Sequence, residues 1–137
     1  MKPFGIWLSL TVLVFGACSG AYHLYLTQNP RKIFVAVDSS FQMNAVWQRV
    51  PATLTTIQQQ RYAQFALVTE KTRIHGWSPT LQLGTLVPYA PRNFSKLESA
   101  AEYPEMAEAA QKYLITTMLD AAQMSKLRGW RMIQLMP

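Results

Sequence analysis

The residues best suited to chemistry in this chain are Asp38, Ser39 and Ser40, which directly follow the apolar run at residues 33–37. A carboxylate and a hydroxyl supply the oxygen ligands that Mg²⁺ prefers. Short polar side chains also favour turns and cap helices. Two interpretations are open: Asp38 and Ser40 bind a divalent metal ion, or they cap the following helix. The cap is favoured, because one carboxylate and one hydroxyl are few ligands for an octahedral ion.

Other catalytic arrangements lack the partners that they need. A serine nucleophile requires a histidine base, and His75, the one histidine beyond the apolar N-terminal segment, lies in no recognisable motif. His75 is interpreted as structural, and a small enzyme built on it is the least favoured alternative. The six glycines are isolated, so no phosphate-binding loop is predicted.

Two further groups of residues are given structural roles. Carboxylates near the start of a predicted helix suit its dipole and are interpreted as a solvated face; these are Glu98, Glu102, Glu105 and Glu108. The later methionines are interpreted as adaptable packing; these are Met118, Met124, Met132 and Met136. The sequence therefore predicts no catalytic residue.

The segment at residues 34–43 resembles the first strand and metal loop of a von Willebrand factor A domain, in which an apolar strand precedes Asp-x-Ser-x-Ser. Asp38 and Ser40 match this pattern, whereas Gln42 replaces the second serine. The resemblance covers about residues 35–100, with 65–68 in the place of the family's second central strand. That family completes its metal site with a later threonine and aspartate, for which no counterpart is recognised. The resemblance implies a truncated, degenerate A domain.

The elements that must position this loop alternate along the chain. Apolar runs predict strands at residues 33–37, 62–70 and 130–136, with a weaker one at 80–87, and residues 72–77 either continue the second strand or pair with it. Helical spacing predicts helices over 45–61, where Pro51 marks a kink or the first turn, and over 106–124, ending before Gly129. Residues 95–98 have the spacing of a capping box, and Pro104 allows a helix to restart. Residues 130–136 are also expected to form an edge strand that accepts a neighbour's sheet.

This alternation predicts an α/β fold, a small three-layer domain with a mostly parallel sheet at residues 33–137. An anchor at 1–27 and a linker at 28–32 precede it. Working loops of such sheets lie at the carboxyl ends of the strands, where Asp38 would stand. The proline-bearing loop at 88–93 is expected to contact a partner through Tyr89, Arg92 and Asn93.

Residues 3–26 contain no charged side chain and are long enough to cross a bilayer as one helix. Aromatic residues that suit the headgroup region lie near both ends of this segment: Phe4, Trp7, Tyr22 and Tyr25. A strip of small residues predicts close packing on another membrane helix: Gly16, Gly20, Ala17 and Ala21.

The one cysteine, Cys18, follows Phe-Gly-Ala in a weak lipoprotein-like cleavage box. A lipoprotein and a cleaved signal are the alternatives to an uncleaved anchor, which is favoured because the apolar run continues past Cys18. Lys2 on one side of the span nearly balances Arg31 and Lys32 on the other. We favour a single-pass protein of a bacterial-type inner membrane, with the domain on the periplasmic side.

The net charge is +6, with thirteen Lys and Arg against seven Asp and Glu. Because these cations are scattered and form no aromatic-interleaved stripe, nucleic-acid binding is not expected. Anionic lipid headgroups or an acidic partner suit such a charge better. The leading expectation is a non-enzymatic accessory or assembly subunit of an integral membrane protein complex, respiratory or photosynthetic by analogy, with no cofactor. The alternative is a metal-assisted adhesion or chaperone module that uses Asp38 and Ser40.

Overall fold

The structure is a computed structural model that describes residues 2–98 and 101–136 and contains two compact units, residues 1–30 and 31–137. The first unit is the helix α1 (Lys2–Gln28), which has no buried residue. It is the one helix of the described part that is long and apolar enough to cross a membrane, a property that N-terminal signal sequences share. The predicted apolar helix is therefore confirmed, whereas its membrane crossing stays a prediction.

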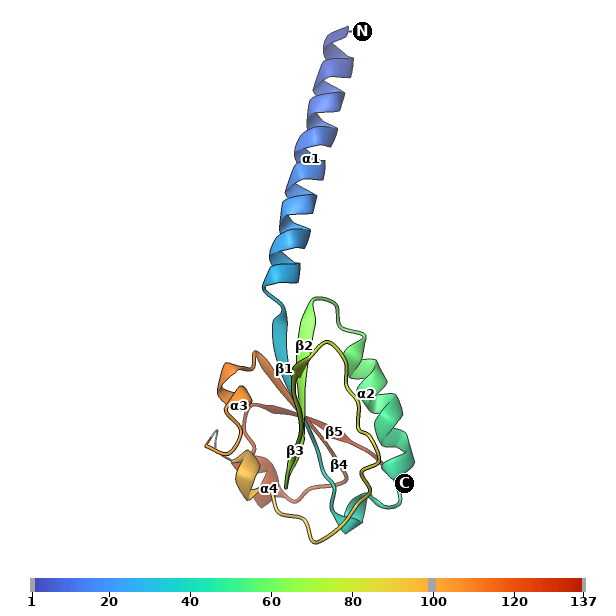
Figure 1. Ribbon diagram of the computed structural model, residues 1–137, viewed down its shortest axis with the longest axis vertical. Helices are drawn as coiled ribbons and strands as arrows, with labels where there is room; N and C mark the ends of the chain where they lie inside the picture. The colour runs from blue at the N-terminus through green and yellow to red at the C-terminus, as the bar shows by residue number, and fades with distance from the viewer. Residues whose placement is uncertain (1, 99–100, 137) are drawn as a thin grey trace. The chain divides into compact units, whose positions relative to one another are not determined.

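The second unit is built on a five-stranded sheet with the order β3-β2-β1-β4-β5 (Figure 1). Its strands are β1 (Arg31–Val37), β2 (Ala63–Thr69), β3 (Arg73–Ser78), β4 (Gln111–Thr116) and β5 (Trp130–Gln134). Four strands run parallel, and β3 pairs antiparallel with β2. The predicted mixed α/β fold with a mostly parallel sheet is confirmed.

Short helices complete this unit. The α-helices are α2 (Val50–Gln58), α3 (Glu105–Glu108) and α4 (Ala121–Lys126), and the 3-10 helices are η1 (Phe41–Met43), η2 (Trp47–Arg49) and η3 (Ser95–Leu97). The ribbon of α2 lies on one side of the sheet, and those of α3 and α4 lie on the other (Figure 1).

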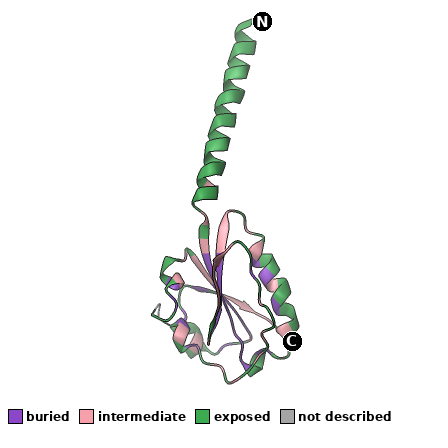
Figure 2. Cartoon of the chain, viewed as in Figure 1, coloured by how far each residue is buried: buried purple, intermediate pink, exposed green. Residues whose placement is uncertain are grey.

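Strand β1 is apolar without interruption because both of its faces are covered. Ile33, Val35 and Val37 pack in one core with α2, whereas Phe34 and Ala36 pack in a second core on the opposite face. All five side chains are fully buried. Figure 2 shows the buried residues concentrated along the strands. This is the pattern expected for the central strand of a parallel sheet.

The helix predicted over residues 106–124 is wrong. The segment instead contains α3, strand β4 and α4, and β4 pairs with both β1 and β5. Tyr113, Leu114 and Ile115 are buried because β4 is covered on both faces. The apolar residues of this segment also recur at the spacing of one helix face, so their periodicity indicated a helix.

Several smaller predictions also need correction. Residues 80–87 form no strand, since Gly84 has a φ of +71° and the amide of Leu81 donates to the side chain of Gln58 at 2.8 Å. In place of the capping box predicted at 95–98, residues Ser95–Leu97 form the 3-10 helix η3 without a side-chain cap. The helix predicted at 45–61 is shorter, and Pro51 stands in the first turn of α2. The other three predicted strands are confirmed, the segment at 72–77 pairs with the second of them as β3, and β5 is an edge strand.

Of the four methionines assigned to packing, Met132 alone packs against a core cluster. Met118, Met124 and Met136 are exposed, so for them the prediction is wrong.

Candidate functional site

The candidate site lies where β1 and β4 end side by side. Within the sheet, β2 and β3 follow β1 on one flank, whereas β4 and β5 lie on the other flank of β1, so the strand order reverses between β1 and β4. Open α/β sheets bind ligands outside the carboxyl ends of the strands at such a reversal. Asp38 follows β1 there, and its amide donates to the carbonyl of Ile115 in β4 at 2.8 Å.

Asp38 is fully buried, and both of its carboxylate oxygens accept hydrogen bonds. Oδ1 accepts from the amide of Ser40 at 2.9 Å. Oδ2 accepts from the hydroxyl of Thr116 at 2.8 Å and from Nε of Arg92 at 2.9 Å. A charge buried in this way is tolerated because it is paired and hydrogen-bonded.

Arg92 closes this edge from the connection between β3 and β4. Its side chain is only 8 % exposed. Besides Asp38, its guanidinium donates to the carbonyl of Met118 at 3.2 Å and to the hydroxyl of Thr117. The arginine thus joins the loops after β1 and β4.

The other two residues of the predicted partner loop lie differently. Tyr89 and Asn93 are exposed, and Oδ1 of Asn93 accepts from the amide of Ser95 at 3.0 Å. The backbone of this loop is attached to the Asp38 loop, since the amide of Tyr89 donates to the carbonyl of Ser39 at 2.7 Å. Arg92 is turned inward, so the predicted contact surface retains Tyr89 and Asn93 only.

A second carboxylate, Glu70, lies beside the first at the end of β2. It is buried and accepts from the amide of Ser39 at 2.8 Å and from the Ser39 hydroxyl at 3.2 Å. Lys71 forms an ion pair with it and also lies 4.7 Å from the ring centroid of Tyr89. This pair was not predicted, although Glu70 and Lys71 follow an apolar strand directly, as Asp38 does.

Ser40 does not cap a helix as expected. It occupies the N-cap position of the short helix η1, but its side chain makes no cap hydrogen bond. Asp38 bonds to the backbone of Ser40 rather than to the helix. The hydroxyl of Ser40 is buried and finds no hydrogen-bond partner among the described residues, which is uncommon in folded proteins.

The donor set does not fit a resident divalent ion in this geometry. The cationic guanidinium of Arg92 already lies against Oδ2 of Asp38, and an ion would have to displace it. Within residues 2–98 and 101–136, no group of three or more His, Cys, Asp and Glu could hold a metal. Thr116, at the end of β4, donates to Oδ2 of Asp38 and takes one more of its acceptor positions. The aspartate that follows β4, Asp120, caps α4.

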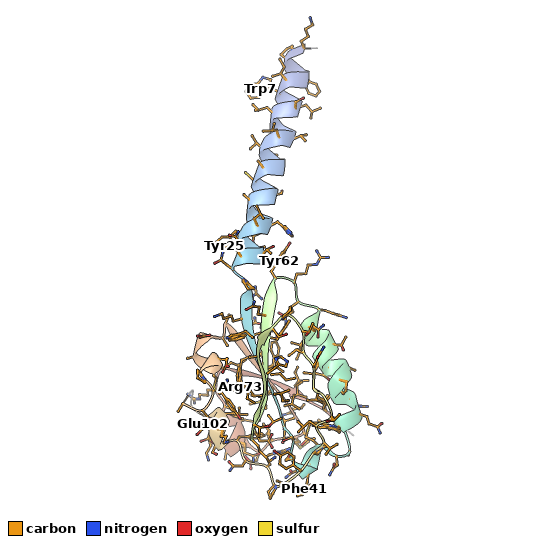
Figure 3. The ribbon with its side chains drawn as sticks, viewed as in Figure 1. Trp7, Tyr25, Phe41, Tyr62, Arg73 and Glu102 are labelled. Carbon is orange, nitrogen blue, oxygen red and sulfur yellow. The ribbon has the colours of Figure 1, made fainter. Side chains whose placement is uncertain are left out.

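Exposed apolar side chains surround this closed network. Five of them, 39–68 % exposed, follow strand carboxyl ends or lie on the connection that is bonded to the Asp38 loop: Phe41, Val87, Tyr89, Met118 and Met136, here called the apolar rim. Figure 3 shows Phe41 projecting at one end of the domain. Two of them, Met118 and Met136, line a hollow of about 260 Å³ together with Arg92.

Three ionisable residues considered in the sequence make contacts within the domain: His75, Glu105 and Glu108. His75 lies in β3 with Nδ1 2.7 Å from the carbonyl of Gly76. Glu105 and Arg73 form an ion pair at 2.7 Å, so Glu105 is not the solvated residue expected. Glu108 accepts from Trp77 and Lys32, and these hydrogen bonds lower the pKa of its carboxyl.

Tyr103 is buried beside the second core and donates from its hydroxyl to the carbonyl of Thr69 at 3.0 Å. Burial, followed by the nearby charge of Glu70, raises the pKa of Tyr103 to about 12.

The residues assigned to membrane packing and to the headgroup region all lie on α1, exposed along its length: Gly16, Gly20, Ala17, Ala21, Phe4, Trp7, Tyr22 and Tyr25. A Cβ added at either glycine would meet nothing within 4 Å in this structure. Their roles stay predictions.

No known protein family, curated protein sequence or solved structure matches this chain. The interpretation of the site therefore rests on its own geometry.

Proposed function

We propose that this chain is a non-enzymatic, single-span accessory or assembly subunit of a larger membrane protein complex of the respiratory or photosynthetic type. In this proposal, the domain binds a neighbouring subunit through the apolar rim. The observation that carries it is the gathering of Phe41, Val87, Tyr89, Met118 and Met136 at one edge of the sheet. Exposed apolar side chains that gather in this way mark protein interaction sites.

The polar groups under the rim support a structural role rather than catalysis. Asp38 and Glu70 are both buried, and each is paired with a cation, Arg92 and Lys71. A general base or nucleophile needs access to a substrate proton or atom. These carboxylates instead hold the loops of the rim in place.

The helix α1 supports the membrane part of the proposal through its 27 residues without a buried side chain. Its exposed strip of Gly16, Ala17, Gly20 and Ala21 suits close approach of a helix from the same complex. We place the domain on the periplasmic side of an inner membrane, an orientation that the near balance of Lys2 against Arg31 and Lys32 allows.

One observation favours the alternative, a metal-assisted adhesion or chaperone module. The buried hydroxyl of Ser40 has no hydrogen-bond partner among the described residues, and the hydroxyl of Thr116 donates to the carboxylate of Asp38 nearby in the same loop cluster. Such a module requires that Arg92 leave Asp38 when the partner arrives. Partner binding that depends on Mg²⁺ and is lost in Asp38→Ala would favour it.

The test is mild-detergent extraction from native membranes, followed by size separation and mass spectrometry. We expect the parent chain to migrate with a large complex at constant stoichiometry. Phe41→Ser with Met118→Ser should release it, whereas Met124→Ser, on an exposed methionine of α4 outside the rim, should not. Migration of the parent chain as a lone small species would refute the proposal.

A further inference from the structure

Positive charge is concentrated at the amino ends of the four parallel strands. Six of the twelve Lys and Arg of residues 31–137 lie there: Arg31, Lys32, Arg61, Lys112, Arg128 and Arg131, here called the cationic rim. The segments that carry them, 29–34, 60–65, 109–114 and 127–132, contain no Asp or Glu. The scattered cations of the sequence thus come to one edge of the sheet, because parallel strands begin at the same edge.

The register of the sheet places these residues on neighbouring strands. Arg31 is level with Ala63 of β2, two residues after Arg61, and Lys112 is level with Trp130 of β5. Strands in a sheet are spaced by about 4.8 Å, so the four strand starts span about 15 Å. This width suits several lipid headgroups at once.

Most of this charge is not neutralised within the domain. Arg31, Arg61, Arg128 and Arg131 are exposed, and among the described residues Lys32 is the only member of the rim in an ion pair, with Glu108 at 3.3 Å. The opposite edge differs, since its cations Lys71 and Arg92 are both paired with buried carboxylates. Arg49, Lys96 and Lys126 lie elsewhere and also form no ion pair among the described residues, so the amino edge holds the largest group of unpaired cations rather than all of them.

Aromatic rings accompany these cations. Lys32 lies 5.4 Å from the ring centroid of Trp77, and Lys112 lies 5.2 Å from that of Trp130. Trp130 belongs to the second core, whereas Trp77 is partly exposed, and proteins place Lys beside an accessible Trp at the membrane interface.

We propose that the cationic rim docks the domain on the headgroups of anionic membrane lipids. This inference rests on the membrane anchor of the proposed function. Helix α1 ends at Gln28 and β1 begins at Arg31, so the linker permits at most about 11 Å between them. A tether this short gives the rim a high effective concentration at the membrane surface, and even weak attraction then suffices.

The experiment uses the full chain with Cys18→Ser, reconstituted in lipid nanodiscs of phosphatidylcholine with or without phosphatidylglycerol. A fluorophore is attached at Gln59→Cys, an exposed position just after α2 at the amino edge, and in a second protein at Met118→Cys on the apolar rim. Nitroxide groups on lipid heads quench a fluorophore that lies close to the surface. We expect phosphatidylglycerol to increase quenching at position 59 and not at 118, and high salt to reverse the increase.

The decisive variant combines Arg61→Glu and Arg128→Glu, two exposed cations of the rim. Each cation near an anionic surface contributes about five-fold to binding, so loss of the two cations should lower the docking equilibrium by at least about 25-fold. The matched control is Lys96→Glu with Lys126→Glu, which changes the net charge equally at positions outside the cationic rim, and it should keep the quenching.

Equal quenching in both lipid compositions, or equal loss in the two double variants, would overturn the inference. It is also overturned if lipid composition has no effect and the Arg61/Arg128 variant instead loses a co-purifying protein, because the rim would then serve an acidic partner. Failure of the chain to insert into nanodiscs at all would refute the anchor, and with it the proposed function.

Discussion

Replacing Arg92 by methionine should destabilise the domain strongly, because it leaves a charge buried without a partner. Asp38 is fully buried, and the Arg92 side chain that neutralises it is 8 % exposed. Removing one member of a buried ion pair costs about 3–5 kcal/mol. A domain of this size has only about 5–15 kcal/mol of stability. For about 100 residues, the melting temperature should therefore fall by at least about 12 °C.

The assay is urea unfolding of the full chain in mild detergent, followed by tryptophan fluorescence. Arg128→Met, at an exposed arginine, is the matched control and should change the free energy of unfolding by less than about 0.5 kcal/mol. Asp38→Asn combined with Arg92→Met removes both charges and should recover part of the loss. A double variant no more stable than Arg92→Met, or a loss below about 1 kcal/mol, would refute the reasoning.

The Arg92→Met variant also tests the alternative function, the metal-assisted module. If Mg²⁺ stabilises Arg92→Met but not the parent chain, an ion can take the place of the guanidinium at Asp38. No effect of Mg²⁺ on either protein would count against the metal-assisted module.

Three further predictions concern the cores and one turn. The raised pKa of Tyr103 implies that its contribution to stability is present below pH 10 and is lost as the pH rises towards 12; Tyr103→Phe should flatten this loss in unfolding measured across that range, and unchanged pH dependence would contradict it. Phe34→Ala empties a site between Tyr103 and Trp130 and should cost about 3–5 kcal/mol in urea unfolding, so a cost below that of a surface change would refute its core position. Gly129 has a φ of +83°, and Gly129→Ala should cost about 1 kcal/mol by the same assay, whereas a neutral result would mean that the turn adopts another conformation.

The first half of the domain could be predicted because its signals are local. Residues 33–37 form an unbroken apolar run rich in β-branched residues with polar turn residues directly after it, which is the pattern of a doubly covered strand. Pro51 fixes the start of α2 for a similarly local reason, since proline is tolerated in the first turn of a helix.

Strand β4 was missed because its identity depends on its neighbours. Its apolar residues fit a helix and a buried strand equally well, and only pairing with β1 and β5 selects the strand. This error also concealed Thr116, which reaches Asp38 only because the two strands end together.

The role of Arg92 could not be inferred from its own loop. It stands after a proline in a connection that resembles an exposed contact loop, and its partner Asp38 is 54 residues away. The available signal was Asp38 itself, because an aspartate at the end of a buried strand needs a cation or several hydrogen-bond donors. Asp38 could thus be identified from the sequence, whereas its counter-ion, Arg92, could be identified only from the fold.

The central position of β1 has a consequence for the nascent chain. This strand leaves the ribosome directly after α1, but its neighbours come from residues that follow much later, as the separations of 31 residues between Ser39 and Glu70 and 78 between Asp38 and Thr116 indicate. Until they arrive, an apolar strand with two open edges invites pairing with other chains. Such long-range pairing slows folding and prolongs exposure to aggregation. During synthesis, the first residues of the domain therefore stay open to such pairing until β4 has emerged.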